Sequence, residues 1–401
     1  MPTTQPDGRV IALNAGSSSL KFGLFAPGDR AEAVLQATGS LTGIGSKARF
    51  EARAPSGHVL AERTWNDRQP SYDELLADLL AWTEAHQGGP LLAAGHRVVH
   101  GGRRFTEPVV VGDLELAQLE AFIPLAPLHQ PHSLALIRSM RSLHPGVPQV
   151  ACFDTAFHST NSRIARLFGL PRALEGAGLI RYGFHGLSYE YVSGELSRRD
   201  PKATAGRTVI AHLGNGASLC ALVAGRSVAT TMGFSVLDGL LMGTRPGSLD
   251  PEVILYLQRE RKMTLSEVED LLYNKSGLLG VSGLSADMRD LHASRSAPAV
   301  EAVELFLYRL QREIGSMVAA AGGLDTLVFT AGIGENDALV RTRACESLGW
   351  LGVEIETAAN GTSTPGRISG LASRVAVWVI PTSEETAIAR HTVAALQLGD
   401  T

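Results

Sequence analysis

A run of small and hydroxyl-bearing residues near the N-terminus ends in a lysine. Residues Asn14 to Lys21 read NAGSSSLK. Glycine and serine let backbone N–H groups and hydroxyls approach a polyanion closely, and the Lys21 ammonium adds a point charge. The spacing is not that of a P-loop, and a polar turn without any ligand would also explain one such cluster. The chemistry that this run could support is phosphate binding.

Two further glycine-rich turns follow expected strands. Residues His212 to Ser218 read HLGNGAS, and residues Gly332 to Asn336 read GIGEN. The Asn-Gly pair in the first is a common hairpin turn and needs no ligand to explain it. The second lies between a strand pattern and a helix pattern, where an anion or nucleoside could meet helix N–H groups. Three such turns together predict a nucleotide held between two lobes.

Two arginines lie beside glycines. Arg97 stands in the run HRVVHGG, and Arg245 stands in the run MGTRPG. Because the guanidinium fork matches the oxygens of carboxylates and phosphates, the pair could clamp a small acid and a phosphoryl group. The alternative is a surface ion pair or a structural arginine, which is the commoner fate of any one arginine.

Several acidic groups and a histidine complete the candidates for chemistry. Asp154 follows an apolar strand pattern, His185 stands in the run RYGFHG, and Glu384 and Glu385 open the last helix pattern. Each could instead be a helix cap, a hydrogen-bonded core group or a complement to a helix dipole. A carboxylate and an amide oxygen that face phosphates would suit a largely hydrated Mg²⁺. Neither zinc-ligand spacing nor a GxSxG elbow is found in the sequence.

Strands and helices must alternate to position these residues. The apolar patterns predict strands at Arg9–Leu13, Leu20–Phe25, Ala48–Arg53, His58–Thr64, Gly95–His100, Gln149–Phe153, Thr208–Leu213, Ser218–Val223, Thr326–Thr330 and Val375–Ile380. They predict helices at Tyr72–His86, Leu114–Ile123, Ser133–Leu143, Pro251–Arg259, Leu265–Tyr273, Val300–Ala321 and Asp337–Leu348. Such alternation is typical of an α/β layered fold, which places ligands at the carboxyl ends of its strands.

The second half of the chain repeats the opening theme. Residues Val10–Ala12 match Val209–Ala211, and Ser19–Leu20 match Ser218–Leu219 at the same offset. Two strand-turn-strand units therefore share a pattern. Chance similarity between hairpins is the alternative to an internally duplicated, two-lobed architecture.

Composition narrows the functional classes. The chain has 401 residues with 36 Lys+Arg against 40 Asp+Glu, a formal charge of −4. This balance gives no general electrostatic reason to bind nucleic acid or an anionic membrane, so we expect neither as a partner. The 43 glycines exceed ordinary usage of about 7%, as expected for many tight turns and close backbone approaches. The 3 scattered cysteines and the short polar N-terminus, without an apolar signal core, predict a cytoplasmic protein.

On these motifs the chain resembles the acetokinase family, a branch of the acetate and sugar kinase, Hsp70 and actin superfamily. The resemblance is carried by NxGSSSxK at 14–21, YGxHG within 181–186, MGTR within 242–250, AGIGEN at 331–336 and PTxEE at 381–385. It implies an α/β fold, a duplicated ribonuclease-H-like (actin-like ATPase) architecture of two lobes with a central active-site cleft. The N-terminal lobe would span 1–158, completed by a C-terminal helix at 386–401. Residues 159–385 would form the nucleotide-binding and dimerisation lobe of a homodimer.

The resemblance also implies a role for individual residues. Asn14 and Glu384 are similar to the Mg²⁺ contacts, with Mn²⁺ as an alternative metal. Arg97 is similar to the arginine that holds the substrate carboxylate. The catalytic group would comprise Asp154, which orients the arginine and a metal-bound water, and the pair His185 and Arg245, which stabilises the transferring phosphoryl group. The nucleotide site would comprise Lys21, His212, Leu213, Gly214, Asn215, Gly216, Asp287, Met288, Arg289, Gly332, Ile333, Gly334, Glu335 and Asn336.

A small apolar pocket for the substrate methyl group is implied as well, at Val99, Leu128, Phe184 and Val236. The sequence departs from the family pattern in three places. Val236 stands where some relatives have proline, Pro246 follows Arg245 where serine is common, and Met288 interrupts an Asp-Phe-Arg segment. The first bears on chain-length preference, the second on how the Arg245 loop is held, and the third on the adenosine side.

The implied activity is reversible, Mg²⁺-dependent phosphoryl transfer from ATP to acetate, which gives acetyl phosphate and ADP by direct in-line attack. Acetate is already a nucleophile at pH 7, so the reaction needs positioning and charge neutralisation more than a strong base. A propionate kinase, or another short-chain carboxylate kinase, would use the same residues with a roomier pocket. An actin- or Hsp70-like ATPase without kinase activity is the alternative from another class.

Overall fold

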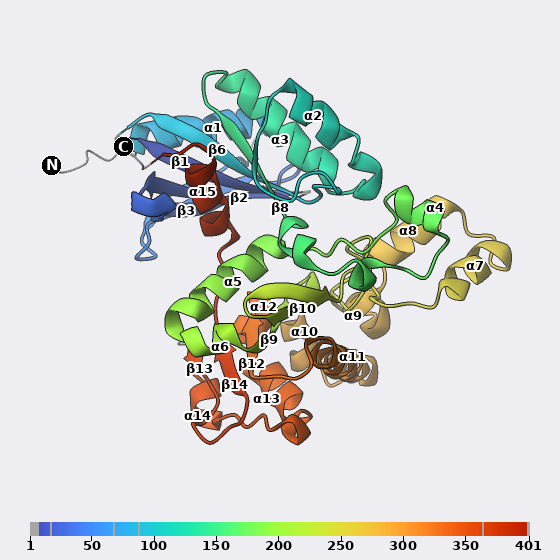
Figure 1. Ribbon diagram of the computed structural model, residues 1–401. Helices are drawn as coiled ribbons and strands as arrows, with labels where there is room; N and C mark the ends of the chain where they lie inside the picture. The colour runs from blue at the N-terminus through green and yellow to red at the C-terminus, as the bar shows by residue number, and fades with distance from the viewer. Residues whose placement is uncertain (1–7, 17, 67–68, 87–88, 363–364, 399–401) are drawn as a thin grey trace. The chain divides into compact units, whose positions relative to one another are not determined.

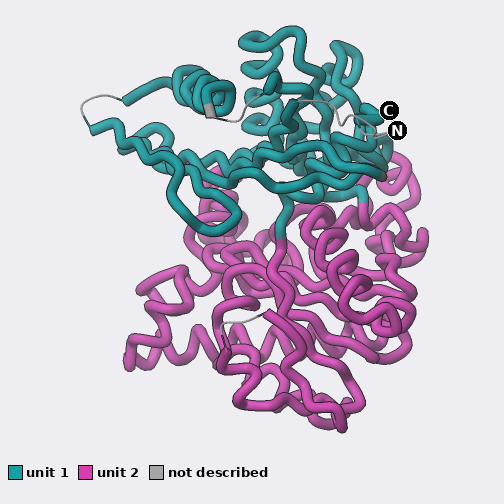
Figure 2. Tube along the Cα trace, turned by 90° about the vertical axis from the view of Figure 1, so that its left-hand side faces the viewer, with its two compact units in different colours: residues 1–156, 383–401 teal, residues 157–382 magenta. Residues whose placement is uncertain are grey.

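The computed structural model describes residues 8–16, 18–66, 69–86, 89–362 and 365–398. Ser17 of the opening turn and the polar N-terminal residues 1–7 lie outside this description. The chain divides into two compact units, shown in Figure 2: residues 1–156 with 383–401 form unit 1, and residues 157–382 form unit 2. Each unit is built around its own β-sheet (Figure 1).

Unit 1 has a mixed sheet in the order β5-β4-β3-β2-β1-β6-β8-β7. Its strands are β1 (Arg9–Ala15), β2 (Ser19–Pro27), β3 (Ala33–Thr42), β4 (Arg49–Arg53), β5 (Val59–Thr64), β6 (Leu91–Val98), β7 (Val109–Val110) and β8 (Gln149–Phe153). The antiparallel strands β1 to β5 form a meander, whereas β1, β6 and β8 run parallel. The parallel strands therefore bring their carboxyl ends to one edge of the sheet.

Helices cover both faces of the unit 1 sheet. They are α1 (Tyr72–His86), α2 (Asp113–Glu120), α3 (Gln130–Leu143) and α15 (Glu384–Ala395), with short 3₁₀ turns η1 (Asp29–Ala31) and η2 (Ile123–Leu125). Because strand side chains alternate between faces, Ile11 and Leu13 of β1 pack in a core with α1 and α3. Val10 packs instead with Val393 of α15. The C-terminal helix thus completes the unit formed by the N-terminal part of the chain.

Unit 2 has a second mixed sheet in the order β11-β10-β9-β12-β14-β13. Its strands are β9 (Arg207–Leu213), β10 (Ala217–Val223), β11 (Arg226–Thr230), β12 (Thr326–Thr330), β13 (Gly366–Arg367) and β14 (Ala376–Val379). Strands β9, β12 and β14 run parallel, and β9, β10 and β11 form an antiparallel meander.

The helices of unit 2 are α4 (Arg172–Gly176), α5 (Gly186–Arg199), α6 (Pro201–Ala205), α7 (Pro251–Arg259), α8 (Leu265–Asn274), α9 (Gly277–Ser282), α10 (Met288–Ala293), α11 (Ala297–Ala321), α12 (Ala331–Asn336), α13 (Ala338–Glu346) and α14 (Thr357–Asn360). The 3₁₀ turns are η3 (Ala156–Thr160), which starts at the unit boundary, η4 (Ile164–Arg166) and η5 (Gly349–Leu351). Helix α5 packs its buried residues Tyr189, Val192 and Leu196 on the sheet. In the described part of the chain, no helix is long and apolar enough to cross a membrane.

The two sheets share a topology. The order β3-β2-β1-β6-β8 in unit 1 corresponds to β11-β10-β9-β12-β14 in unit 2, each an antiparallel meander followed by two parallel strands. The weak repeat between Val10–Ala12 and Val209–Ala211 falls on the equivalent strands β1 and β9. The internal duplication expected from the sequence is therefore confirmed.

The structure contains elements that the sequence did not predict, such as β3 (Ala33–Thr42), and three differences lie near candidate site residues. Residues 331–336, expected as a turn, form helix α12, because Ala331 adopts a left-handed φ of 64° and turns the chain directly into a helix. Helix α5 was not predicted, since it follows His185 within a run rich in glycine and polar residues. The last helix begins at Glu384 and ends at Ala395 where 386–401 was expected, and residues 399–401 lie outside the described part.

Candidate functional site

Three predicted site residues of unit 1 lie at the carboxyl ends of adjacent parallel strands. Asn14 is close to the end of β1, Arg97 is the penultimate residue of β6, and Asp154 follows the last residue of β8. The register pairs Leu13 with His96 and Arg97 with Cys152, which places these ends side by side. The topology therefore brings together side chains far apart in the sequence.

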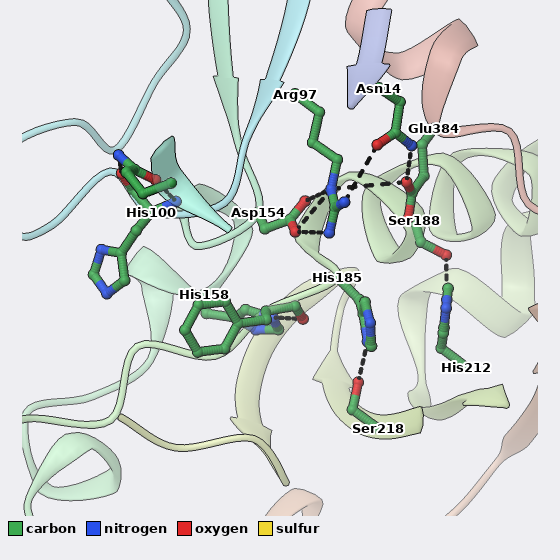
Figure 3. A network of polar contacts seen from close by, with 12 residues as sticks. Asn14, Arg97, His100, Asp154, His158, His185, Ser188, His212, Ser218 and Glu384 are labelled. Carbon is green, nitrogen blue, oxygen red and sulfur yellow. Dashed lines mark hydrogen bonds and ion pairs between the residues drawn. The ribbon is translucent and has the colours of Figure 1, made fainter. Parts of the chain in front are cut away.

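Arg97 and Asp154 form a buried ion pair (Figure 3). The Arg97 Nη2 lies 2.6 Å from Asp154 Oδ2, and the Nε donates to both carboxylate oxygens at 3.0 and 3.1 Å. The Asp154 side chain is 0% exposed and that of Arg97 20% exposed. Burial disfavours the charged guanidinium, but the carboxylates of Asp154 and Glu384 outweigh it and raise the pKa of Arg97. Burial raises the pKa of Asp154, and Arg97 opposes that rise.

Asn14 connects this pair to the N-terminus of α15. Its Oδ1 accepts from Arg97 Nη1 at 3.2 Å, and its Nδ2 donates to Glu384 Oε2 at 2.8 Å. Lys21, opposite Asn14 in the β1–β2 hairpin, acts electrostatically on the neighbouring Glu385. Burial, followed by the charge of Glu384, raises the pKa of the Glu385 carboxyl. Unit 1 therefore gathers two cations, an amide and three carboxylates in one group.

Asn14 and Glu384 are the candidate ligands for a metal ion in unit 1. Among the described residues, no group of three or more His, Cys, Asp or Glu side chains could hold a metal ion by itself. However, the amide and carboxylate oxygens of this adjacent pair are hard ligands. Mg²⁺ is commonly held through one or two protein oxygens, with water and phosphate oxygens as the other ligands. The donor set fits such an ion.

Unit 2 contains a cavity of about 860 Å³. Its lining comprises Gly214, Asn215, Ala286, Asp287, Met288, Arg289, His292, Gly332, Ile333, Asn336, Asp337 and Ala338. The cavity is within the size range of small-molecule sites, which is about 300–1,000 Å³. Eight of these residues are predicted nucleotide contacts, from three separate segments of the sequence. The structure thus brings all three predicted unit 2 segments to one cavity.

The other predicted nucleotide residues of unit 2 do not line this cavity. Leu213 is buried in β9, and Gly216 lies in the β9–β10 turn. Gly334 lies inside α12. The carboxylate of Glu335 is turned toward the backbone: its Oε1 accepts from the N–H of Ala331 at 2.7 Å and that of Thr382 at 3.0 Å. Glu335 therefore ties the end of β12 to the segment after β14.

His212 and His185 stack on each other in unit 2. Their ring centroids are 4.2 Å apart and the rings are 15° from parallel. His185 precedes α5 with a φ of 59°, a conformation that costs a residue other than glycine roughly 1–3 kcal/mol. The preceding Gly183 has a φ of 78°, and a Cβ there would lie 2.5 Å from the ring of buried His158. Such close packing holds His185 in its unusual conformation.

Arg245 lies beside His185. Its Nη1 donates to the carbonyl of Val236 at 2.7 Å. A Cβ at Gly216 would lie 2.7 Å from Arg245 Nη2 and 3.4 Å from His185 Nε2. The guanidinium and the imidazole therefore converge over the backbone of Gly216, as expected for two groups that act on one anion.

The four predicted apolar contacts fall in both units. Val99 follows β6 and is buried, whereas Leu128 is 40% exposed. Phe184 is buried next to His185, and Val236 is half-buried in the loop that holds Arg245. Their assignment to one pocket stays a prediction.

Four residues lining the unit 2 cavity were not predicted: Ala286, His292, Asp337 and Ala338. His292 Nε2 lies 2.8 Å from Asp337 Oδ2, so these two form a polar contact at the cavity. A sequence signal existed for both, since His292 is three residues beyond Arg289 on one helix and Asp337 directly follows Asn336. Asp287 Oδ2 accepts a hydrogen bond from Arg289 Nη2, and this hydrogen bond lowers the pKa of Asp287 to about 2.

Similarity to known proteins extends over nearly the whole chain. Residues 9–390 match the Acetokinase family. A protein of Rhodopseudomonas palustris described as acetate kinase is 51% identical over 389 residues, covering 95% of this chain and 97% of its relative. One of Methylocella silvestris with the same description is 49% identical, covering 96% and 98%.

Solved structures agree with the sequence relatives. The crystal structure of Porphyromonas gingivalis acetate kinase has a TM-score of 0.86 at 33% identity, covering 97% of this chain and 100% of that one. The structure of a propionate kinase from Francisella tularensis has a TM-score of 0.88 at 35% identity, covering 96% and 99%. These similarities confirm the predicted duplicated α/β fold class of the actin-like ATPases. By profile, sequence and structure, the chain belongs to the acetokinase family.

Proposed function

We propose that the protein transfers a phosphoryl group reversibly between ATP and acetate, with acetyl phosphate and ADP as the products. Relatives described as acetate kinase, up to 51% identical over 95% of this chain, support this reaction. The observation that carries the proposal is the hydrogen-bonding state of Arg97. A guanidinium has five N–H donors. Among the described residues, three of them are engaged, by Asp154 and Asn14, which leaves two for a carboxylate.

Asp154 acts in this proposal as a positioning residue and not as a base. It is already occupied by Arg97, with one contact of 2.6 Å. Acetate needs no deprotonation at pH 7, because the carboxylic acid titrates far below this value. A fixed and charged Arg97 orients the nucleophile, which lowers the barrier by positioning.

In the forward step, an acetate oxygen forms a bond to the γ-phosphorus of ATP while the bond to the β,γ-bridging oxygen breaks. The electron pair stays on the β-phosphate of ADP, and no proton is transferred. Charge on the transferring group is the main barrier, so donors fixed in advance are effective. We assign this task to His185 and Arg245, because both lie over Gly216.

We assign the metal to Asn14 and Glu384. Mg²⁺, or Mn²⁺ in its place, would neutralise phosphate charge when bound with the nucleotide. Glu384→Gln keeps the shape of the side chain but removes its charge. It should weaken the binding of Mn²⁺ with ADP, measured by electron paramagnetic resonance, and unchanged Mn²⁺ binding would exclude Glu384 as a ligand.

The reaction is tested by trapping its product. Purified protein with ATP, Mg²⁺, acetate and hydroxylamine should form acetyl hydroxamate at a rate that depends on acetate. ATP hydrolysis without hydroxamate would favour the actin- or Hsp70-like ATPase instead. Arg97→Ala should mainly raise the KM for acetate, whereas Arg245→Ala should mainly lower kcat.

Substrate length is the second question, because a neighbour of known structure is a propionate kinase. Val99, Leu128, Phe184 and Val236 are the proposed contacts of the substrate alkyl group. One methylene in an apolar pocket changes kcat/KM by about 10- to 200-fold. Comparing acetate, propionate and butyrate therefore decides the preferred acid, and a higher kcat/KM for propionate would replace acetate in the proposal.

We further propose a homodimer. Helix α7 (Pro251–Arg259) contains no buried residue. Its apolar side chains include Val253, Leu255 and Tyr256, which are 40–51% exposed. Such an apolar helix face is expected to be covered by a partner. Light scattering after size exclusion should give twice the mass of one chain, and Tyr256→Glu should shift the mass toward that of one chain.

Two remaining expectations stay proposals. We propose that unit 1, residues 1–156 with 383–401, is the lobe of the carboxylate and the metal, and that unit 2, residues 157–382, is the lobe of the nucleotide and the dimer contact. A cytoplasmic location is supported by three buried cysteines without disulfide bonds. Fractionation of the native cells with an antibody would test the location.

A further inference from the structure

A buried chain of hydroxyl groups ends on the imidazole of His185. The Nδ1 of His185 lies 2.8 Å from Ser218 Oγ (Figure 3), and the same Oγ lies 2.5 Å from the hydroxyl of Tyr189. Ser218 is on β10, and Tyr189 is on α5, one helical turn after His185. Both are 0% exposed, so water does not compete for these hydrogen bonds.

The proton of Tyr189 fixes the direction of this chain. Among the described residues, Ser218 Oγ is the only hydrogen-bond partner of the phenol oxygen. Burial raises the pKa of Tyr189 well above its ordinary value, so the phenol keeps its proton. A buried donor without an acceptor costs about 1–3 kcal/mol. Tyr189 therefore donates to Ser218.

Ser218 then has one proton of its own to place. Besides the oxygen of Tyr189, the described side-chain contacts of Ser218 Oγ comprise only His185 Nδ1. If Nδ1 carried a proton, both neighbours would donate to Ser218 and its own proton would lack an acceptor. If Nδ1 accepts a hydrogen bond from Ser218, the hydroxyl protons of Tyr189 and Ser218 both have an acceptor. The arrangement with no orphaned donor is Tyr189 to Ser218 to His185.

We infer that Ser218 and Tyr189 are positioning residues that set the tautomer of His185, with Nδ1 as acceptor and the proton on Nε2. The hydrogen bond made by one ring nitrogen determines the state of the other. The Nε2 is the atom that converges with Arg245 over Gly216, so an N–H donor points to that place. The inference deepens the proposed function and rests on it where it assigns this donor to the transferring phosphoryl group.

A second chain of hydroxyls has the same form. The Oγ1 of Thr382 donates to Ser188 Oγ at 2.8 Å, and Ser188 Oγ lies 2.8 Å from His212 Nδ1. Because Ser188 receives the proton of Thr382, it can donate its own proton to His212. The two stacked rings thus receive a hydroxyl at the same nitrogen.

Neutron diffraction from deuterated crystals of the full chain tests the tautomer without reference to activity. The expected result is deuterium on His185 Nε2 and on the Ser218 hydroxyl, directed at Nδ1. Deuterium on Nδ1 alone would overturn the inference. If Nε2 carries deuterium but His185→Ala leaves kcat unchanged, the tautomer stands and the role on the phosphoryl group fails.

Kinetics separates positioning from structural support. Ser218→Ala should lower kcat about tenfold and Tyr189→Phe about threefold, with KM values for ATP and acetate within about twofold. Ser193→Ala, which removes another buried hydroxyl from α5, is the matched control and should keep kcat.

The double variant decides between the two roles. Ser218→Ala leaves the Tyr189 hydroxyl without its acceptor, and adding Tyr189→Phe removes that hydroxyl, which should restore thermal stability. If Ser218 acts through His185, kcat of the double variant stays about tenfold low. Recovery of kcat together with stability would assign both residues a structural role only and overturn the inference.

Discussion

Replacing Arg97 by methionine isolates the Asp154 carboxylate in the interior of unit 1. The pair is joined by a contact of 2.6 Å, and the Asp154 side chain is 0% exposed. Burial raises the pKa of Asp154, and Arg97 is the main group that lowers it. Methionine keeps an unbranched apolar side chain but removes the cation. We therefore expect Asp154 to titrate at a higher pH in the variant than in the native protein.

The loss of unfolding free energy differs between the two possible replacements, because Asp154 is more deeply buried than Arg97. Breaking a buried ion pair by removing one partner costs about 3–5 kcal/mol. Arg97→Met should lie in the upper part of this range at pH 8, because the remaining carboxylate has no exposure to water. Asp154→Asn should cost less, at the lower end of this range or about 3 kcal/mol, because Arg97 is 20% exposed and keeps Glu384 at 4.0 Å.

The pH dependence has a definite sign. In Arg97→Met, the folded pKa of Asp154 lies above its unfolded value, so the folded state binds the additional proton. This contribution is present below the unfolded pKa and is lost as the pH rises through the folded pKa. The free energy of unfolding of the variant should therefore fall, relative to the native protein, from pH 5 to pH 8.

The assay compares Arg97→Met with Arg97→Met/Asp154→Asn by urea denaturation at pH 5, 6.5 and 8. The double variant lacks the titrating carboxyl, so the difference between the two cancels the other titrating groups of the protein. We expect the double variant to be the more stable at pH 8 and the advantage to shrink at pH 5. A difference that does not vary with pH would refute the assignment of a buried, charged Asp154.

Three further predictions concern other residues. Burial lowers the pKa of three histidines to about 4: His96, His100 and His158. The pKa of a histidine in the unfolded state is higher, so the unfolded state binds more protons as the pH falls. The free energy of unfolding should therefore fall from pH 7 to pH 5 by about 2 kcal/mol for each of these histidines. Equal urea midpoints at both pH values would contradict this. The Tyr72 hydroxyl is buried and has no hydrogen-bond partner among the residues that the structure describes. Tyr72→Phe should therefore unfold at the same or a higher temperature, and a lower unfolding temperature would contradict this. Gly216→Ala should displace the guanidinium of Arg245 and lower kcat at least tenfold, while the melting temperature changes little. A variant with the kcat of the native protein would show that Gly216 is not part of the site.

The sequence carried enough information to predict the strands that position the site. The apolar runs before Asp154 and Ala331 coincide with β8 (Gln149–Phe153) and β12 (Thr326–Thr330), because short buried runs bounded by polar or glycine residues have few alternatives. The glycine motifs were placed correctly at strand ends for the same reason. Two of them, with residues 287–289, meet at the unit 2 cavity.

Other features depend on contacts that a linear pattern does not contain. The GIGEN run predicts a place where an anion or nucleoside meets helix N–H groups. It does not predict that the carboxylate of Glu335 accepts from two backbone N–H groups, one from a segment 47 residues away. His185 precedes a helix although its φ of 59° is unfavourable, and the close approach of Gly183 to the ring of His158 in that turn is not visible in the sequence. The hydroxyls behind His185 come from α5 and β10, which are not adjacent in sequence.

The two units share a strand order but present different residues at the equivalent strand ends. The ends of β1, β6 and β8 present Asn14, Arg97 and Asp154, whereas the equivalent ends of β9, β12 and β14 lead into Gly214, Ala331 and Pro381. A small carboxylate offers little surface for contact, so its recognition requires a charged partner fixed in advance. A nucleotide offers a large surface and needs space with accessible backbone N–H groups, which small residues supply. Under the proposed function, one strand order would thus serve two ligands through the different residues at its strand ends.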